Sequence, residues 1–280
     1  MLFFSAIIQP FILIALGFAL SRSRMFPRSL WSGVEKLVYY VLFPPLLFNS
    51  MARAELSLPQ AGLYLACGIG AMAAGVALAW IVSRLAPAGR LTDASVRQCG
   101  YRFNSYIGFA LVLALYGETG FALFALLVGV WAPACNMIAV ADLAAAGGGQ
   151  GAGAAGILKA IARNPIILST LAGLVFNAAG LPLPGLAAST LKSLGAASLP
   201  LALMAIGAGL KLSAMRSQAR LLGVASAERL IAVPAVSLAL GLAAGLSNAE
   251  LGALLCFTAL PTANSCYILA VRMGGDGPAV

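Results

Sequence analysis

The stretch Gln9-Pro10-Phe11-Ile12-Leu13 returns in the second half of the chain as Asn164-Pro165-Ile166-Ile167-Leu168. In both halves a further proline follows at the same distance, at Pro45 and at Pro200. All four prolines lie in apolar segments, where a proline interrupts the backbone hydrogen bonding of a helix. A duplicated membrane bundle with interrupted helices is typical of secondary transporters, whose substrate site lies between the two repeats.

The composition places the chain in a membrane. Hydrophobic residues make up 61% of it and charged residues only 9%, whereas soluble domains carry about 25% charged residues. The first apolar run, Leu2–Leu20, has its basic residues after it and none before it, so we interpret it as a retained helix and not as a signal peptide. The net charge of +9 does not indicate nucleic-acid binding, because the cations lie in short loops between apolar runs.

Nine apolar segments are long enough to be membrane spans. They are residues 2–20, 34–52, 60–83, 97–116, 120–142, 160–180, 189–211, 220–245 and 251–272. Basic residues gather in every second loop, beginning with the loop after the first segment, and Arg84, Arg90 and Arg97 are counted among them. The positive-inside rule then puts the amino terminus outside. Since the high alanine content and the excess of Arg over Lys favour a bacterial source, we expect a multi-pass protein of the bacterial cytoplasmic (inner) membrane.

The arrangement of the repeats predicts two inverted halves. Residues 1–143 hold five segments, an odd number, so the second repeat enters the membrane from the opposite side. Residues 144–158 are nearly all Ala and Gly and are expected to form a flexible cytoplasmic linker. Residues 159–280 hold only four segments. By symmetry a tenth helix is missing, and we expect a truncated chain or a last helix supplied from elsewhere.

Polar residues recur at related places in the fourth and ninth segments. Asn104-Ser105 in the first half corresponds to Asn264-Ser265 in the second, where Pro261 and Thr262 precede them. Pro261 has no amide proton, so the carbonyl of Phe257 loses its helical partner. If both helices break here, two half-helix amino termini provide partial positive charge for a small anion. The alternative is that these Asn and Ser residues only bridge helices.

Further candidate residues have weaker support. Pro45, Asn49 and Pro200 are expected to flank the substrate, although the prolines can equally be simple kinks. Arg102 either neutralises a substrate carboxylate or anchors its helix at the membrane face.

Glu228 and Arg229 lie near one end of the eighth segment. Arg229 is expected to snorkel to the interface and Glu228 to pair with a neighbouring cation, and a role in coupling is the alternative. No Asp or Glu lies at the middle of a segment, so a buried carboxylate relay is not expected.

Nothing in the sequence indicates a metal, a cofactor or an enzyme. The chain has no histidine, and its five cysteines show no metal-type spacing. A membrane-embedded transferase needs clustered Asp or a catalytic His or Cys, and neither pattern is present. A membrane sensor is a further alternative, which replacement of Asn104 and Asn264 without loss of activity would favour.

Four stretches, taken in their order and spacing, resemble the auxin efflux carrier family. They are 38–48, 164–167, 199–203 and 260–264. The resemblance covers nearly the whole chain. It implies an all-helical, polytopic bundle of ten helices in inverted five-helix repeats, similar to the fold of bile-acid symporters and sodium/proton antiporters.

The resemblance also implies that helices 4 and 9 cross at broken points beside the substrate. The matching residues here are Asn104 and Ser105 on the first of these helices, and Pro261, Thr262 and Asn264 on the second. The family's proline after the first Asn is replaced by Gly108-Phe109-Ala110, so helix 4 is expected to be less sharply broken.

The sequence therefore predicts a secondary carrier of small organic anions, mono- or dicarboxylates, that works by alternating access. Helix dipoles and side-chain amides are expected to select the anion. The expected partners are the anion and the lipid bilayer, with no nucleic acid and with a homodimer as one possible assembly. Coupling to Na+ or H+ is the main alternative, because Na+ could bind the unwound carbonyls near Pro261.

Overall fold

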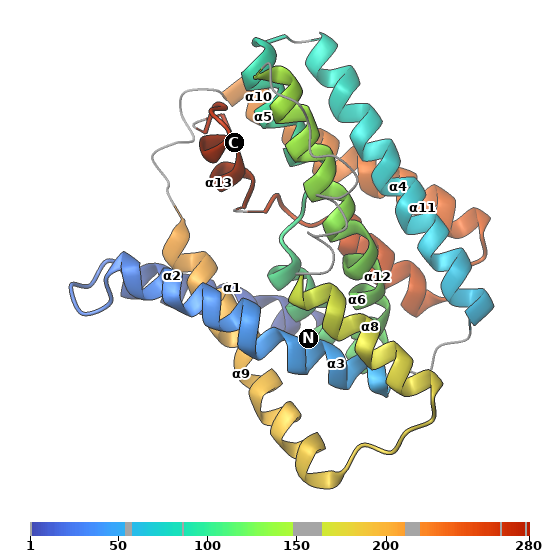
Figure 1. Cartoon of the computed structure of the whole chain (residues 1–280). Helices are drawn as coiled ribbons and strands as arrows, with labels where there is room; N and C mark the ends of the chain where they lie inside the picture. Colours follow the sequence, from blue (N-terminus) through green and yellow to red (C-terminus); the bar gives the residue numbers. More distant parts are fainter. Residues whose placement is uncertain are drawn as a thin grey trace. The chain divides into compact units, whose positions relative to one another are not determined.

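A computed structural model of the chain describes residues 2–53, 58–85, 87–147, 164–210, 219–263, 265–277 and 279–280. These residues form helices and contain no β-strand (Figure 1). The helices of the first half are α1 (Leu2–Ser21), α2 (Arg28–Leu37), η1 (Val38–Leu42), α3 (Phe43–Ala52), α4 (Leu58–Leu85), α5 (Arg90–Tyr101) and α6 (Ser105–Ala146). Those of the second half are α8 (Pro165–Ala178), α9 (Gly185–Gly209), α10 (Ala219–Ala227), η3 (Glu228–Ala232), α11 (Val233–Ala243), α12 (Asn248–Thr258) and α13 (Ser265–Arg272).

The predicted all-helical class is confirmed, and all nine predicted segments lie mainly on these helices. Among the described residues, four helical stretches are long and apolar enough to cross a bilayer: 61–85, 90–146, 185–209 and 223–243. Two shorter apolar helices cover 8–21 and 165–178. The stretch 90–146 contains two predicted segments, which are separated inside α6 at Gly117 (φ +62°, ψ −155°). This backbone conformation is open to glycine and closed to most other residues.

Prolines follow closely on each of the two wide helical turns. The π-helical turn η1 runs directly into Pro44 and Pro45 at the start of α3, and η3 runs into Pro234 at the start of α11. A proline has no N–H to donate and its ring collides with the carbonyl four residues back, and a wider turn relieves that collision. The local geometry of Glu228 and Arg229, both on η3, therefore originates in Pro234.

The chain divides into two compact units, and each draws on both halves of the sequence. Unit 1 comprises Met1–Leu56, Tyr106–Gly129 and Ile161–Leu210. In it α1 packs on α9, and α3 packs on α8 and α9. Glycines bring α1 and α9 into backbone contact, because a Cβ on Gly17 would collide with the backbone of Met204 and one on Gly207 with that of Ile14. The phenyl ring of Phe109 contacts three other rings, those of Phe43, Phe121 and Phe124.

Unit 2 comprises Ser57–Ser105, Val130–Ala160 and Lys211–Val280. Within it α4 packs on α5 and α11, α11 packs on α12, and both α10 and α13 pack on α5. The predicted interruptions of the fourth and ninth segments both fall in this unit. The predicted linker 144–158 begins on the last turn of α6, which ends at Ala146, and residues 148–158 lie outside the described part.

Candidate functional site

Two apolar segments of unit 2 are interrupted where the sequence predicts. Helix α5 ends at Tyr101 and α6 begins at Ser105, with Arg102 in an extended conformation between them (φ −94°, ψ 146°). Helix α12 ends at Thr258, and α13 begins at Ser265 (Figure 1). The second break is the longer of the two, in keeping with the expectation that the fourth segment is broken less sharply. Its proline explains the difference, because no proline stands in the first break.

The two breaks are hydrogen-bonded to each other. The backbone N–H of Asn104 donates to the carbonyl of Pro261 at 2.9 Å. The hydroxyl of Thr262 donates to the carbonyl of Cys99 at 3.0 Å, so the last turn of α5 is satisfied by the second break. The two interrupted backbones therefore supply part of each other's missing hydrogen bonds, which is how irregular backbone is tolerated at membrane depth.

Arg102 lies at the centre of this crossing and is 5% exposed. One amino group donates to the amide oxygen of Asn136 and to the hydroxyl of Ser265, at 2.7 and 2.9 Å. The other donates to Gln98 Oε1 at 2.7 Å and, at 3.5 Å, to the carbonyl of Ser265. The expectation of an anchor at the membrane face is wrong, because the guanidinium is buried and reaches across to α13. Its hydrogen-bond acceptors within the described part of the chain are all neutral, so no carboxylate there neutralises its charge.

Arg229 is the second buried guanidinium at the crossing. Its side chain is 1% exposed, and it donates to the carbonyls of Leu260 and Phe257 at 2.9 and 3.1 Å. The Phe257 carbonyl is the one that Pro261 deprives of a helical donor. The expectation that Arg229 snorkels to the interface is therefore wrong, since it serves as the donor that the broken helix lacks.

Glu228, the neighbour of Arg229, is also buried, with 7% of its surface exposed. Its Oε1 has no hydrogen-bond partner among the described residues. The carboxylate lies against Gly100 in the last turn of α5, where an added Cβ would collide with it. Glu228 forms no ion pair within the described part of the chain, and the expected pairing with a neighbouring cation stays a prediction, because the side chain of Arg220 lies outside that part.

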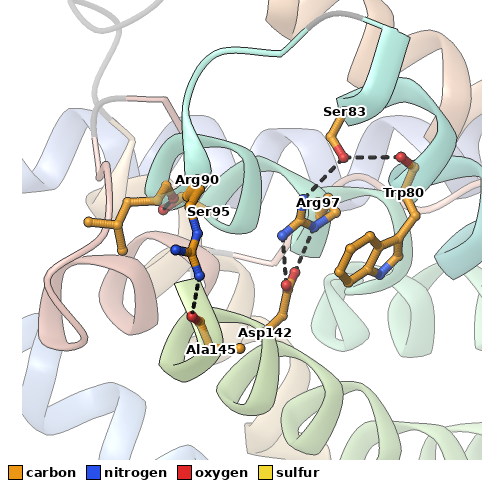
Figure 2. A network of polar contacts seen from close by, with 8 residues as sticks. Trp80, Ser83, Arg90, Ser95, Arg97, Asp142 and Ala145 are labelled. Carbon is orange, nitrogen blue, oxygen red and sulfur yellow. Dashed lines mark hydrogen bonds and ion pairs between the residues drawn. The ribbon is translucent and has the colours of Figure 1, made fainter. Parts of the chain in front are cut away.

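Arg97 and Asp142 form an ion pair in the described part of the chain. Figure 2 shows the guanidinium of Arg97 in a two-pronged contact with the carboxylate, at 2.7 Å from Nε and 2.6 Å from Nη2. The group also donates to Ser83 and stacks on the ring of Trp80, 4.0 Å from its centroid. Arg97 was predicted to be one of the loop cations. It lies instead on α5 and fastens that helix to the end of α6.

The structure brings together five of the nine predicted site residues, all in unit 2. They are Asn104, Ser105, Pro261, Thr262 and Ser265. Asn264 lies outside the described residues.

The other three, Pro45, Asn49 and Pro200, belong to unit 1. Asn49 lies on α3 with its Oδ1 buried and without a partner in the described part. Pro200 is exposed on α9 and Pro45 is half-buried.

Three polar residues at the crossing have structural roles that were not predicted from the sequence: Gln98, Asn136 and Arg229. A signal was present for each, because an uncharged amide or a cation within an apolar segment is costly without a partner. Which partner each one finds depends on tertiary contacts between segments far apart in the sequence.

Comparison with known proteins identifies the class. A family described as "Membrane transport protein" matches residues 2–143 and 155–277. The chain belongs to this membrane transport family. It is the auxin efflux carrier family that the proline-containing motifs resemble. A relative from Rhizobium meliloti (strain 1021), named "Putative malonate transporter", is 25% identical over 279 residues, which cover 96% of this chain and 87% of the relative.

The membership settles the broad activity: the protein is a multi-pass membrane transporter and not an enzyme. At the helix breaks this transporter combines two buried guanidinium groups with the first turns of α6 and α13. Within the described residues, no group of three or more His, Cys, Asp and Glu side chains could hold a metal ion. The chemistry available at the breaks is the binding of an anion by fixed positive charge and helix termini.

Proposed function

We propose that this transporter carries small organic anions, mono- or dicarboxylates, across the cytoplasmic membrane of a bacterium. The anion binds at the crossing of the two interrupted segments. Asn104, Ser105, Thr262, Asn264 and Ser265 contribute polar groups beside Pro261.

The observation that carries the proposal is the environment of Arg102. A buried charge is costly unless it is paired, and such a charge in a membrane protein commonly marks a ligand pathway. Arg102 is buried, and among the described residues its hydrogen bonds go only to amide, hydroxyl and carbonyl oxygens. An anionic substrate would supply the missing opposite charge. A carboxylate suits this role, because its two oxygens match the fork of a guanidinium.

A dicarboxylate is the first substrate class to test. The relative from Rhizobium meliloti has malonate in its name and aligns over nearly the whole of this chain. Two guanidinium groups, those of Arg102 and Arg229, lie on residues that contact the second break. Two cations suit a dianion better than a monoanion, so we rank malonate above lactate as a ligand.

The transport cycle that we infer is alternating access between two inverted five-helix repeats, residues 1–143 and 159–280, joined by the segment 144–158. Helix dipoles and side-chain amides select the anion, as the sequence suggests, and the buried guanidinium of Arg102 adds a fixed charge. Pro45, Asn49 and Pro200 of unit 1 would contribute to the substrate pathway. The amino terminus lies outside, and the protein is able to form a homodimer.

Sodium coupling at the second break has less support than the sequence alone suggested. A bound Na+ would need the unwound carbonyls around Pro261. Those of Phe257 and Leu260 accept hydrogen bonds from Arg229, and that of Pro261 accepts one from Asn104. A guanidinium therefore occupies the position that a sodium ion would take.

A ligand-dependent thermal-unfolding screen of the purified chain in detergent tests the proposal. The panel contains malonate, malate, lactate, indole-acetate, a bile acid and a neutral sugar, each with and without Na+. A ligand at about 100 times its Kd stabilises a protein by about 2.7 kcal/mol, which moves the midpoint measurably.

Two variants make the screen specific to the site. Arg102→Gln should abolish the shift that malonate produces, whereas Arg53→Gln removes the same charge at an exposed position and should keep it. The absence of a shift with every anion, in a chain that still unfolds cooperatively, would refute the proposed function. An equal shift in the Arg102→Gln variant would refute the proposed site.

A further inference from the structure

One turn of helix touches both interrupted segments. The π-helical turn η3 presents Glu228 to the last turn of α5, where the carboxylate meets Gly100. The next residue, Arg229, points to the second break and donates to the carbonyls of Phe257 and Leu260. Two adjacent side chains of opposite charge thus reach one broken segment each. Wide turns of this kind often occur at functional sites.

One oxygen of the Glu228 carboxylate lacks, among the described residues, the partners that usually accompany a buried charge. Glu228 is 7% exposed, and its Oε1 receives no hydrogen bond in the described part of the chain. The guanidinium of Arg229 is turned away to the second break. An ionised carboxylate in such surroundings is costly, and binding a proton removes that cost.

Three charged residues of α5 are engaged elsewhere, whereas Cys99 and Tyr101 flank Gly100 in the turn that Glu228 contacts. Arg97 is paired with Asp142, Arg90 donates to the carbonyl of Ala145, and Asp93 accepts from the backbone of Ala88. The titratable and charged residues on the helices that pack on η3 are Tyr64, Cys67 and Arg84 on α4, Arg90, Asp93, Arg97, Cys99 and Tyr101 on α5, and Arg220 on α10, whose side chain lies outside the described part; α11 has none.

We propose that Glu228 is the residue that binds a coupling proton, so that the anion is carried together with H+. The inference rests on the proposed anion transport and identifies its coupling ion. A proton from water adds to the carboxylate on the side where the anion enters, and returns to water on the side where the anion leaves. No covalent bond other than this O–H bond forms or breaks.

Charge balance explains why the two ligands would move together. With Glu228 ionised, its negative charge offsets one of the two guanidinium groups, Arg102 and Arg229. With Glu228 protonated, both positive charges act on the anion. Anion binding therefore favours protonation, and protonation favours anion binding to the same degree, because coupling between two ligands is reciprocal.

A proton fits this site better than a sodium ion. Sodium needs several oxygen ligands, whereas the Glu228 carboxylate lies against Gly100, which has no side chain to offer one. The nearby carbonyls of Phe257 and Leu260 are taken by Arg229, whose own charge would repel a metal cation. A proton needs one oxygen and no further ligand.

The experiment measures the affinity of the whole chain for malonate at about pH 6.5 and at about pH 8.5. Exposed carboxylates have ordinary pKa values of about 4, so they stay ionised at both pH values and do not contribute to the difference. The wild type should bind malonate on the order of tenfold more tightly at the lower pH. This is the effect of removing one unit of negative charge about 10 Å from the anion at an effective dielectric constant of about 20. Glu228→Gln should bind tightly at both pH values, and Glu228→Asp should keep the pH dependence. Glu118→Gln, which changes an exposed carboxylate, is the matched control and should behave as the wild type.

A second readout does not depend on the anion. Infrared spectra of the wild type should show the C=O stretch of a protonated carboxyl group at the lower pH, and the band should be missing in Glu228→Gln. If no anion binds, the proposed transport substrate is wrong, and the band alone decides whether Glu228 holds a proton. The proposal is overturned if the band persists in Glu228→Gln, if that variant keeps the pH dependence of the wild type, or if binding requires Na+ and loses this requirement with Glu228→Gln.

Discussion

Replacing Arg229 by methionine should loosen the second helix break. Methionine replaces the aliphatic part of the side chain but has no donor, so the carbonyls of Phe257 and Leu260 lose hydrogen bonds of 3.1 and 2.9 Å. A buried acceptor left without a donor costs about 1–3 kcal/mol, or about 2–6 kcal/mol for two. Removal of the buried guanidinium recovers part of this, because its desolvation is also costly. We therefore expect a loss of about 2–4 kcal/mol in the free energy of unfolding.

Two measurements report this loss. For a chain of this size each kcal/mol corresponds to about 2–4 °C in the unfolding midpoint, so we expect the Arg229→Met variant to melt roughly 5–15 °C below the wild type. The local effect is read at Cys266, which is fully buried near the start of α13. In a variant that keeps Cys266 as its sole cysteine, maleimide should label this thiol faster once Arg229 is replaced.

Two controls separate the lost hydrogen bonds from other effects. Arg229→Lys keeps the charge but offers a single ammonium instead of a fork, so it should fall between methionine and the wild type. Arg53→Met removes an exposed arginine and should leave the midpoint unchanged. If the Arg229→Met variant unfolded at the same temperature as the wild type and Cys266 were labelled no faster, the hydrogen bonds of Arg229 would not stabilise the second break.

Three further predictions concern packing and charge. Gly207→Ala pushes α9 away from the backbone of α1 and should lower the free energy of unfolding by about 1–3 kcal/mol. Gly33→Ala adds a methyl group in open space and should leave the unfolding midpoint unchanged or slightly raised. Gly100→Ala places a methyl group against a buried carboxylate and should also lower the midpoint; a value equal to that of Gly33→Ala would contradict this contact. Arg97→Gln and Asp142→Asn should each cost roughly 1.5–3 kcal/mol, and the double variant little more than either. Strictly additive losses in that cycle would contradict the ion pair.

The helices and the second break could be predicted because local chemistry determines them. Long apolar runs must be helical in a bilayer, and Pro261 cannot continue a helix. The first break contains no proline, and it was predicted from the repeated Asn-Ser pair and from the family resemblance. Its physical cause is visible only in three dimensions, where Asn104 donates to Pro261 and Arg102 reaches Ser265.

The behaviour of the charged residues was predicted less well. Arg229 and Glu228 lie near the end of an apolar segment, where snorkelling is the usual expectation. Arg229 lies on the wide turn before Pro234 and instead reaches inward, where it donates to the carbonyl of Phe257 on α12. Arg97 was assigned to a loop because its partner, Asp142, is on a different segment. Periodicity and composition contain no information on such pairings.

The hydrogen bonds between the two breaks also set an order for biosynthesis. Arg102 and its partner Ser265 are separated by 163 positions in the chain. At about 5–20 residues per second, the ribosome needs roughly 8 to 30 seconds to make the intervening sequence. Gln98 and Asn136 are available to Arg102 in that interval, but the acceptors at Pro261 and Ser265 are not. The first interrupted segment therefore leaves the translocon incomplete, and its final backbone geometry forms only when the ninth segment is inserted beside it.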